Sequence, residues 1–437
     1  MEFWIKAGQL VLSLSILIVL HELGHFIPAR WFKTRVEKFY LFFDPGFSLF
    51  KKKIGETEWG IGWLPLGGYV KIAGMIDESM DTKQLEKPAQ PWEFRSKPAW
   101  QRLIIMIGGV TVNLILGFLI YMMVLWVWGR EYVTMDAAPY GVHVQQELKQ
   151  YGFQDGDIIL SAEGKPVEDL RELNVGILLR GYREIEVQHS SGDKETITLP
   201  EDIDYTLFQK DAFPAFSIRS HFSVDSVLPV TPASNAGMMQ GDSIISINGE
   251  PVVFFQDFTN QLRELKGEKV DLVVWRNNTA VTLTPEIDTL GKLGFSALQH
   301  IETTQIDYTF GQALASGFSY GYWTLHDYVA QLKFIFTKKG ASSLGGFGAI
   351  GNMFSPTWNW QSFWLNTAFI SIVLAFMNIL PIPALDGGHV MFLLYEMITG
   401  REPNKKVLEY AQMIGIILLL GLLLYANGND IFRFFFK

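Results

Sequence analysis

A run of apolar residues near the N-terminus is long enough to cross a lipid bilayer, yet it carries three groups that are costly in hydrocarbon. The run covers residues 5–29 and contains His21, Glu22 and His25. About 20 apolar residues in a helix span the hydrocarbon core of a membrane. Ionisable side chains at that depth usually face protein or a water-filled cavity and indicate a functional site. The chain must therefore fold so that other segments enclose these three side chains.

The three polar groups have the spacing of an H-E-x-x-H motif, which reads His21-Glu22-Leu23-Gly24-His25. Helix residues four apart project from one face, so both imidazoles can reach one metal ion. Glu22 can then act as general base towards a water at that metal. Two buried histidines and a buried glutamate with structural roles are the alternative, and they would leave three desolvation costs unexplained.

A third metal ligand must come from elsewhere in the chain. Catalytic zinc usually takes three protein ligands, and with no cysteine in the sequence the third must be His, Asp or Glu. Asp386 is the best candidate, because it follows an apolar span that is broken by Pro381 and Pro383. Prolines interrupt a helix, and such a break is tolerated in a membrane where it lines a cavity. His389 is the rival ligand.

Three further segments are apolar and long enough to cross a membrane, at residues 103–128, 364–380 and 407–425. The expected fold class is an α-helical multi-pass membrane protein with four transmembrane helices, a membrane-associated β-hairpin and two inserted α+β domains. The net charge of −9 argues against nucleic-acid binding, which needs a basic surface. We expect a lipid bilayer to surround these helices.

Basic residues in short flanking segments predict the orientation of the spans. The first span is not read as a signal peptide, because Glu2, the polar motif and the lack of a small-residue cleavage site argue against it. We expect the basic flanks to be cytoplasmic, with both termini and the long region 129–363 on the outer side. The basic residues are Arg30, Lys33, Arg35, Lys38, Lys51, Lys52, Lys53, Arg95, Lys97, Arg102, Arg401, Lys405 and Lys406.

Residues 58–75 read as short extended pieces separated by glycine and proline, with many aromatics and few charges. We expect a β-hairpin that dips into the membrane edge near the metal, where its backbone must be covered by protein or line a cavity. An ordinary surface hairpin is the alternative. The polar residues 77–91 are expected to form a loose loop.

The region after the second span contains an internal repeat with a constant offset of 85 residues, from Gly152 to Gly237. Segments 152–167 and 237–252 match at their glycine, aspartate, proline and valine positions. Each copy has a Gly-Asp turn, an apolar strand and a Pro-Val restart, and so resembles the signature of PDZ domains. Such domains bind peptides by strand addition to a sheet edge. A spacer or size filter without a peptide ligand is the alternative.

An apolar helical face follows the repeats, from Phe310 to Phe336, and leads to the glycine-rich segment 344–351. Its spacing of three or four residues predicts a helix at the membrane interface, or one that packs on the second repeat. The expected domains are 1–128 with the first two spans, 129–215 and 216–300 as PDZ-like domains, 301–360 as helix and connector, and 361–437 with the last two spans.

The motifs together resemble the site-2 protease family of intramembrane zinc metalloproteases. The matching residues are His21-Glu22-Leu23-Gly24-His25 in the first span and Asn378, Pro381, Pro383 and Leu385-Asp386-Gly387 after the third. Two PDZ-like repeats between the second and third spans resemble its regulator of sigma-E protease branch. The resemblance covers motif order, span count, hairpin and repeats.

This resemblance implies a Zn²⁺ enzyme in which His21, His25 and Asp386 bind the metal and Glu22 is the catalytic base. Asn378 would hold the substrate strand or the developing oxyanion, beside Pro381 and Pro383. The hairpin would present the substrate as an extended strand through Gly67, Gly68, Tyr69 and Val70.

The implied substrates are single-span membrane proteins, such as anti-sigma factors or remnant signal peptides, cut inside the bacterial inner membrane after a first external cut. The implied setting is envelope stress signalling.

The sequence departs from the family pattern at two places and leaves two other functions open. Gly108-Gly109 and Gly346-Phe347-Gly348 stand where the family often has Gly-Pro, and neither is expected to touch a ligand. A PDZ-bearing scaffold with a structural metal would need four protein ligands. A metal transporter would need ionisable residues along several spans, whereas the second span offers only Asn113 and the fourth Glu409.

Overall fold

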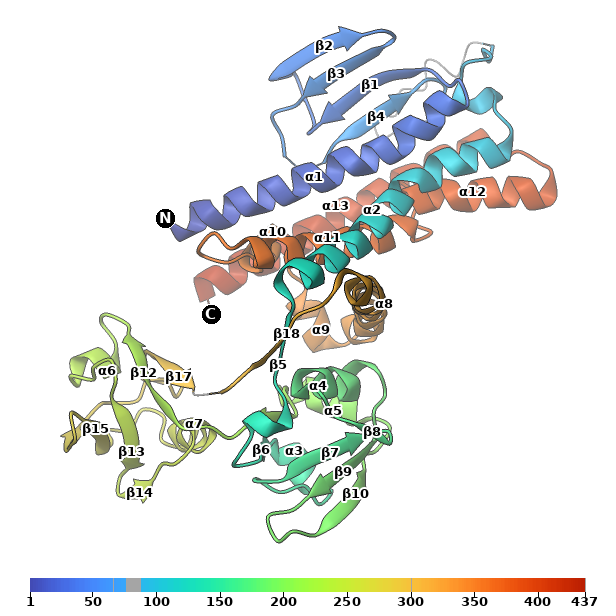
Figure 1. Cartoon of the computed structure of the whole chain (residues 1–437). Coiled ribbons are helices and arrows are strands. Elements are labelled where there is room, and N and C mark those ends of the chain that lie inside the picture. Colours follow the sequence, from blue (N-terminus) through green and yellow to red (C-terminus); the bar gives the residue numbers. More distant parts are fainter. Residues whose placement is uncertain (66, 76–87, 300, 437) are drawn as a thin grey trace. The chain divides into compact units, whose positions relative to one another are not determined.

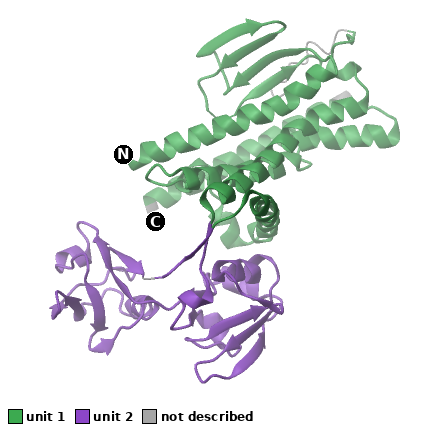
Figure 2. Ribbon diagram, viewed as in Figure 1, with its two compact units in different colours: residues 1–129, 307–437 green, residues 130–306 purple. Residues whose placement is uncertain are grey.

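The computed structural model describes residues 1–65, 67–75, 88–299 and 301–436. The chain forms two compact units, of which one comprises residues 1–129 and 307–437 and the other residues 130–306 (Figure 2). The first unit contains the apolar helices and a small sheet, and the second contains the internal repeat (Figure 1). Most of the predicted loop, residues 77–87, lies outside the described residues.

Four helices in the described part of the chain are long and apolar enough to cross a membrane, as predicted. They are α1 (Glu2–Trp31), α2 (Ala99–Trp128), α11 (Trp360–Ile379) and α13 (Lys405–Phe436). The shorter helices of this unit are α8 (Phe310–Ile335), α9 (Lys338–Ser343), α10 (Phe347–Asn352) and α12 (Asp386–Thr399).

Helix α2 is the centre of the first unit and packs on α1, α8, α11 and α12. Small residues allow the closest contacts: a Cβ atom on Gly24 of α1 would lie 2.5 Å from the carbonyl oxygen of Gly108 on α2. Between membrane helices, glycine lets backbones approach closely and increases van der Waals contact. Buried hydroxyls add polar links, since Ser371 Oγ of α11 donates to the Asn113 carbonyl of α2 at 2.6 Å.

A four-stranded sheet lies between α1 and α2 in sequence, and its order is β2-β3-β1-β4. The strands are β1 (Val36–Leu41), β2 (Phe50–Ile54), β3 (Thr57–Ile61) and β4 (Tyr69–Ile72). The predicted hairpin over residues 58–75 is wrong, because β3 and β4 do not pair with each other. Both pair with β1, β3 in parallel and β4 antiparallel.

The physical reason for this error is that β1, which lies within the basic stretch after the first span, inserts between β3 and β4 as an interior strand. Phe39 and Tyr40 of β1 are buried, although Glu37 and Lys38 next to them mask the apolar pattern. The result is that β4 is an edge strand of the sheet, with only β1 beside it among the described strands. Helix α1 contacts both β1 and β4.

Helix α8 packs on α2 and α11 within the first unit, so packing on the second repeat is not needed to explain its apolar residues. Cβ atoms on Gly317 and Gly321 would meet Met122 and Phe118 of α2 at 2.6 and 2.9 Å. Large apolar side chains on the rest of α8 are exposed, which fits the predicted place at a membrane interface. They are Phe310, Leu314, Phe318, Tyr322, Val329.

The second unit confirms the internal repeat, because two of its sheets have the same topology. Their orders are β10-β9-β7-β8 and, for the second copy, β16-β15-β13-β14. Each sheet has a bulge at the same place, between Ile159 and Ser161 and between Ile244 and Ser246. Each copy has its own buried core.

The first copy contains β7 (Ile158–Ala162), β8 (Lys165–Pro166), α4 (Leu170–Leu179), β9 (Glu184–Gln188), β10 (Lys194–Thr198) and α5 (Ile203–Gln209). The second contains α6 (Pro232–Asn235), β13 (Ser243–Ile247), β14 (Glu250–Pro251), α7 (Phe255–Glu264), β15 (Leu272–Arg276) and β16 (Thr279–Leu283). Flanking elements are β5 (Arg130–Tyr132), β6 (Val142–Val144), α3 (Gln146–Lys149), β11 (Phe216–Ile218), β12 (Phe222–Val227), β17 (Phe295–Gln299) and β18 (Thr304–Ile306).

The two copies pair one equivalent buried aspartate with different cations. Asp157 in the first copy is 2.8 Å from His189 Nδ1, whereas Asp242 in the second bonds Arg276 Nε at 2.7 Å. The hydrogen bond to Asp157, and a second to Glu195 at 3.2 Å, raise the pKa of His189. Arginine stays charged over the whole accessible pH range.

We predict that the first copy, and not the second, loses stability as the pH rises. A histidine whose pKa is raised by folding stabilises the fold fully below its unfolded pKa of about 6.5 and loses that contribution through the raised value. Hydrogen exchange of the full chain, corrected for intrinsic rates, should show less protection of β9 at about pH 9 than at about pH 6. His189→Arg should remove the difference, and an equal loss of protection in β15 would contradict the prediction.

Candidate metal centre

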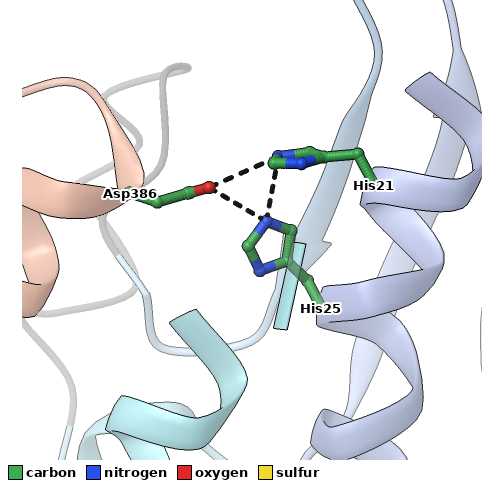
Figure 3. Close-up of side chains that lie close together, drawn as sticks. All are labelled: His21, His25 and Asp386. Atoms are coloured by element: carbon green, nitrogen blue, oxygen red, sulfur yellow. Dashed lines mark hydrogen bonds and ion pairs between the residues drawn. The ribbon is translucent and has the colours of Figure 1, made fainter. Parts of the chain in front are cut away.

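Two imidazoles and one carboxylate converge in the first unit, as Figure 3 shows. His21 Nε2 and His25 Nε2 lie 3.2 Å apart. Asp386 Oδ2 lies 3.3 Å from the first nitrogen and 3.4 Å from the second. The three predicted ligand atoms therefore form a nearly equilateral triangle. All three side chains are largely withdrawn from solvent.

The triangle has the size that a tetrahedral zinc ion requires. Ligand bonds of about 2.0–2.1 Å at tetrahedral angles place neighbouring ligand atoms about 3.3 Å apart. Asp386 Oδ2 is buried and has no hydrogen-bond partner among the described residues. Its lone pairs therefore face the two imidazole nitrogens without a donor to satisfy them. These observations fit a cation with three protein ligands and an open fourth position.

The local structure explains how two of the ligands are presented. Helix α1 continues without a break through the motif, so His21 and His25 are one turn apart. His25 Nδ1 lies 2.9 Å from the carbonyl oxygen of Ile105 on α2 and donates to it. This bond places the proton on Nδ1 and leaves the lone pair of Nε2 facing the triangle.

The proline break presents the third ligand. Helix α11 ends at Ile379, and α12 begins at Asp386 itself. Between them, Ala384 has a φ of +78°, a left-handed conformation that non-glycine residues rarely adopt. A Cβ atom on Gly387 would lie 2.2 Å from the carbonyl oxygen of Leu380, so the start of α12 lies directly against the end of α11. The turn thereby points Asp386 at α1.

A cavity of about 620 Å³ opens beside the triangle. It brings together the three ligand candidates, Glu22, and three of the four predicted strand residues, namely Gly68, Tyr69 and Val70. Glu22 is 9% exposed, and a backbone hydrogen bond from Val70 reaches its carboxylate. Edge strand β4 is therefore next to both the candidate base and the candidate metal ligands.

The profile of peptidase family M50 matches residues 9–422, which is nearly the whole chain. This chain belongs to peptidase family M50. A regulator of sigma E protease from Haemophilus influenzae is 26% identical over 99% of this chain and 100% of its own length. The protease RseP from Yersinia pestis is 28% identical over 98% and 99%. A Neisseria meningitidis protein named as a proposed zinc metalloprotease is 26% identical over 97% and 98%.

The predicted enzyme class, a zinc metallopeptidase of the site-2 protease type, is thereby confirmed. Several predicted site residues of this M50 peptidase lie outside the cavity lining. Asn378 is half-buried near the end of α11, Pro381 is exposed, and Pro383 packs against Gly415 of α13. Gly67 packs against Phe43. His389 lines the cavity but is not part of the ligand triangle.

The expectation that Gly108-Gly109 would not touch a ligand is wrong. A Cβ atom on Gly109 would lie 2.4 Å from His25 Nε2 and 2.6 Å from His21 Cε1. Glycine here allows both imidazoles to lie against the backbone of α2. The sequence showed the glycine pair, but only the packing of α2 on α1 reveals what faces it. Asn113, noted only as a polar residue in the second span, also contacts His21, at 3.3 Å.

Gly109→Ala in this M50 peptidase should lower the zinc content of the purified protein. The added methyl would push against His25 Nε2 while the Ile105 carbonyl holds the ring through Nδ1, and so would distort the ligand triangle. Elemental analysis after dialysis measures the effect. Gly8→Ala is the matched control, because nothing lies within 4 Å of a Cβ atom there. Equal zinc in both variants and the wild type would show that Gly109 does not shape the site.

Proposed function

We propose that this M50 peptidase is an intramembrane endopeptidase that cuts within the transmembrane segments of single-span proteins. The observation that carries the proposal is that His21 and His25 lie on α1, a helix long and apolar enough to cross a membrane, and meet Asp386 at the start of α12. Glu22 and an edge strand line the same cavity. A site on a membrane-spanning α1 would be reached by a bond that itself lies within the membrane, which favours a transmembrane segment as substrate.

The proposed roles follow from the geometry. His21, His25 and Asp386 hold the metal, and His25 is oriented through Ile105. Zinc held there would polarise the peptide carbonyl as a Lewis acid and make the attacking water more acidic. Glu22 takes a proton from that water and passes it to the leaving nitrogen. Its burial beside Val70 keeps the carboxylate at the cavity wall, where both transfers occur.

Strand β4 is the proposed docking site for the substrate. A transmembrane helix shields its peptide carbonyls by its own hydrogen bonds, so it must unwind before attack. A sheet edge with no further strand beside it in the described ranges offers a place where an extended segment can add as a strand. Gly68, Tyr69 and Val70 line the cavity at that edge. We further propose that Asn378 holds the bound strand or the oxyanion, and that Pro381 and Pro383 shape the break before Asp386.

The biological setting is proposed from charge and from the relatives. The basic flanks favour both termini and the second unit on the periplasmic side of a bacterial inner membrane, with the active site towards the cytoplasm. The two repeats would act as PDZ-like domains that bind peptide or exclude intact substrates by size. We also propose that cleavage follows a first external cut and serves envelope stress signalling, and relatives named as regulators of sigma E protease support a role linked to sigma E.

A scaffold with a structural metal is the competing function. A structural zinc site is usually closed by four protein ligands. The cluster within the described residues offers three, and all three side chains line the cavity. The open position favours catalysis over a structural role.

Glu22→Gln should abolish cleavage of a truncated single-span substrate and leave zinc binding intact. Glutamine keeps the volume and the contact with Val70 but cannot accept the proton. Cleavage is measured in detergent or liposomes by gel shift of the substrate, and zinc by elemental analysis. Undiminished cleavage by the variant would remove Glu22 from the role of base.

Asp386→Asn should weaken zinc binding while the chain stays folded. The amide is nearly isosteric with the carboxylate but lacks its charge, so one of the three ligands binds the metal more weakly. Competition with a chelator measures the affinity, and His389→Gln serves as control because His389 lines the same cavity without joining the triangle. A loss of zinc in His389→Gln alone would identify His389 as the third ligand instead.

A further inference from the structure

Asn113 is a polar side chain in the middle of α2, and it is only 1% exposed. Its Nδ2 lies 3.3 Å from His21 Nδ1. Its Oδ1 is buried without a hydrogen-bond partner among the described residues. Burying an amide in an apolar span without pairing its oxygen is costly. The catalytic roles proposed above make no use of this residue.

The chemistry of the ligand triangle determines which atom His21 needs opposite its Nδ1. His21 meets the triangle through Nε2, so that nitrogen must keep its lone pair free for the metal. The proton of the neutral ring is then on Nδ1, which becomes a donor. An amide NH₂ opposite it would set donor against donor. Rotating the amide by half a turn, which exchanges two nearly indistinguishable atoms, places Oδ1 there as an acceptor.

His25 shows the same arrangement with a backbone partner. Its Nδ1 donates to the Ile105 carbonyl, also on α2. Ile105, Gly109 and Asn113 are spaced four apart, so they form one stripe along α2. The Ile105 carbonyl at one end of the stripe accepts from His25, and Asn113 at the other end faces His21. Gly109 lies between them, and its missing Cβ lets both rings lie against the helix.

We propose that Asn113 is a positioning residue that accepts a hydrogen bond from His21 Nδ1–H through Oδ1 and so fixes the ring for metal binding. The inference rests on the proposed zinc site. Partners of this kind fix the tautomer and orientation of a metal-binding histidine and raise its basicity. The side chain acts on the metal only through His21, whose Nδ1 lies 3.3 Å from it.

The test compares zinc affinity in Asn113→Leu and Asn113→Asp, using the purified full-length protein and a competing chelator. Leucine has a similar size but no acceptor, and it should weaken zinc binding roughly 10- to 100-fold. Aspartate has only acceptors, and it should bind zinc at least as tightly as the wild type. Ser371→Ala is the matched control, because it removes a buried hydrogen bond to the Asn113 backbone without touching an imidazole.

Wild-type affinity in Asn113→Leu would overturn the proposal. Weak binding in Asn113→Asp would also overturn it, because an amide that donates through Nδ2 cannot be replaced by a carboxylate. Thermal unfolding of the apo protein shows whether the leucine variant folds. If it does not fold, the zinc affinity of Asn113→Asp still tests the proposal. His21→Ala distinguishes a failure of the proposed zinc site from a failure of the proposed role of Asn113. Zinc retained in that variant would refute the zinc site itself.

Discussion

The close packing of α1 on α2 is the constraint on which the rest of the first unit depends. Gly24 and Gly108 let the two backbones approach, and Gly109 lets both imidazoles lie against α2. Without that approach, His21 and His25 would face hydrocarbon with unpaired nitrogens, which is costly. With it, α2 becomes the surface that orients the ligands, and a site made for hydrolysis can exist on a membrane helix.

The other walls of the site come from interruptions of regular structure. Helix α11 stops at Ile379, and the proline break lets α12 restart at Asp386, which therefore points across at α1. The sheet contributes an edge, β4, rather than a hairpin, and Val70 reaches Glu22 from it. The continuous helix α1 supplies His21, Glu22 and His25 to the cavity, while the broken segment supplies Asp386 and the sheet edge supplies Val70.

The second unit repeats one fold with a changed charge pair. Both copies bury an aspartate at the same bulged strand, yet one pairs it with His189 and the other with Arg276. Equal topology therefore does not mean equal pH dependence, because the histidine can lose its charge as the pH rises, whereas the arginine stays charged. Each copy is built around its own buried apolar core.

The sequence by itself determined the four spans, the repeat, the fixed spacing of His21, Glu22 and His25, and Asp386 as the third ligand candidate. These features are local in the chain: hydropathy over about 20 residues, helical periodicity and a proline break. Only the tertiary structure decided that β1 separates β3 from β4, that Gly109 lies against both histidines and that Asn113 faces His21. Those facts depend on which surfaces meet between segments far apart in sequence, and no local pattern encodes a contact of that kind.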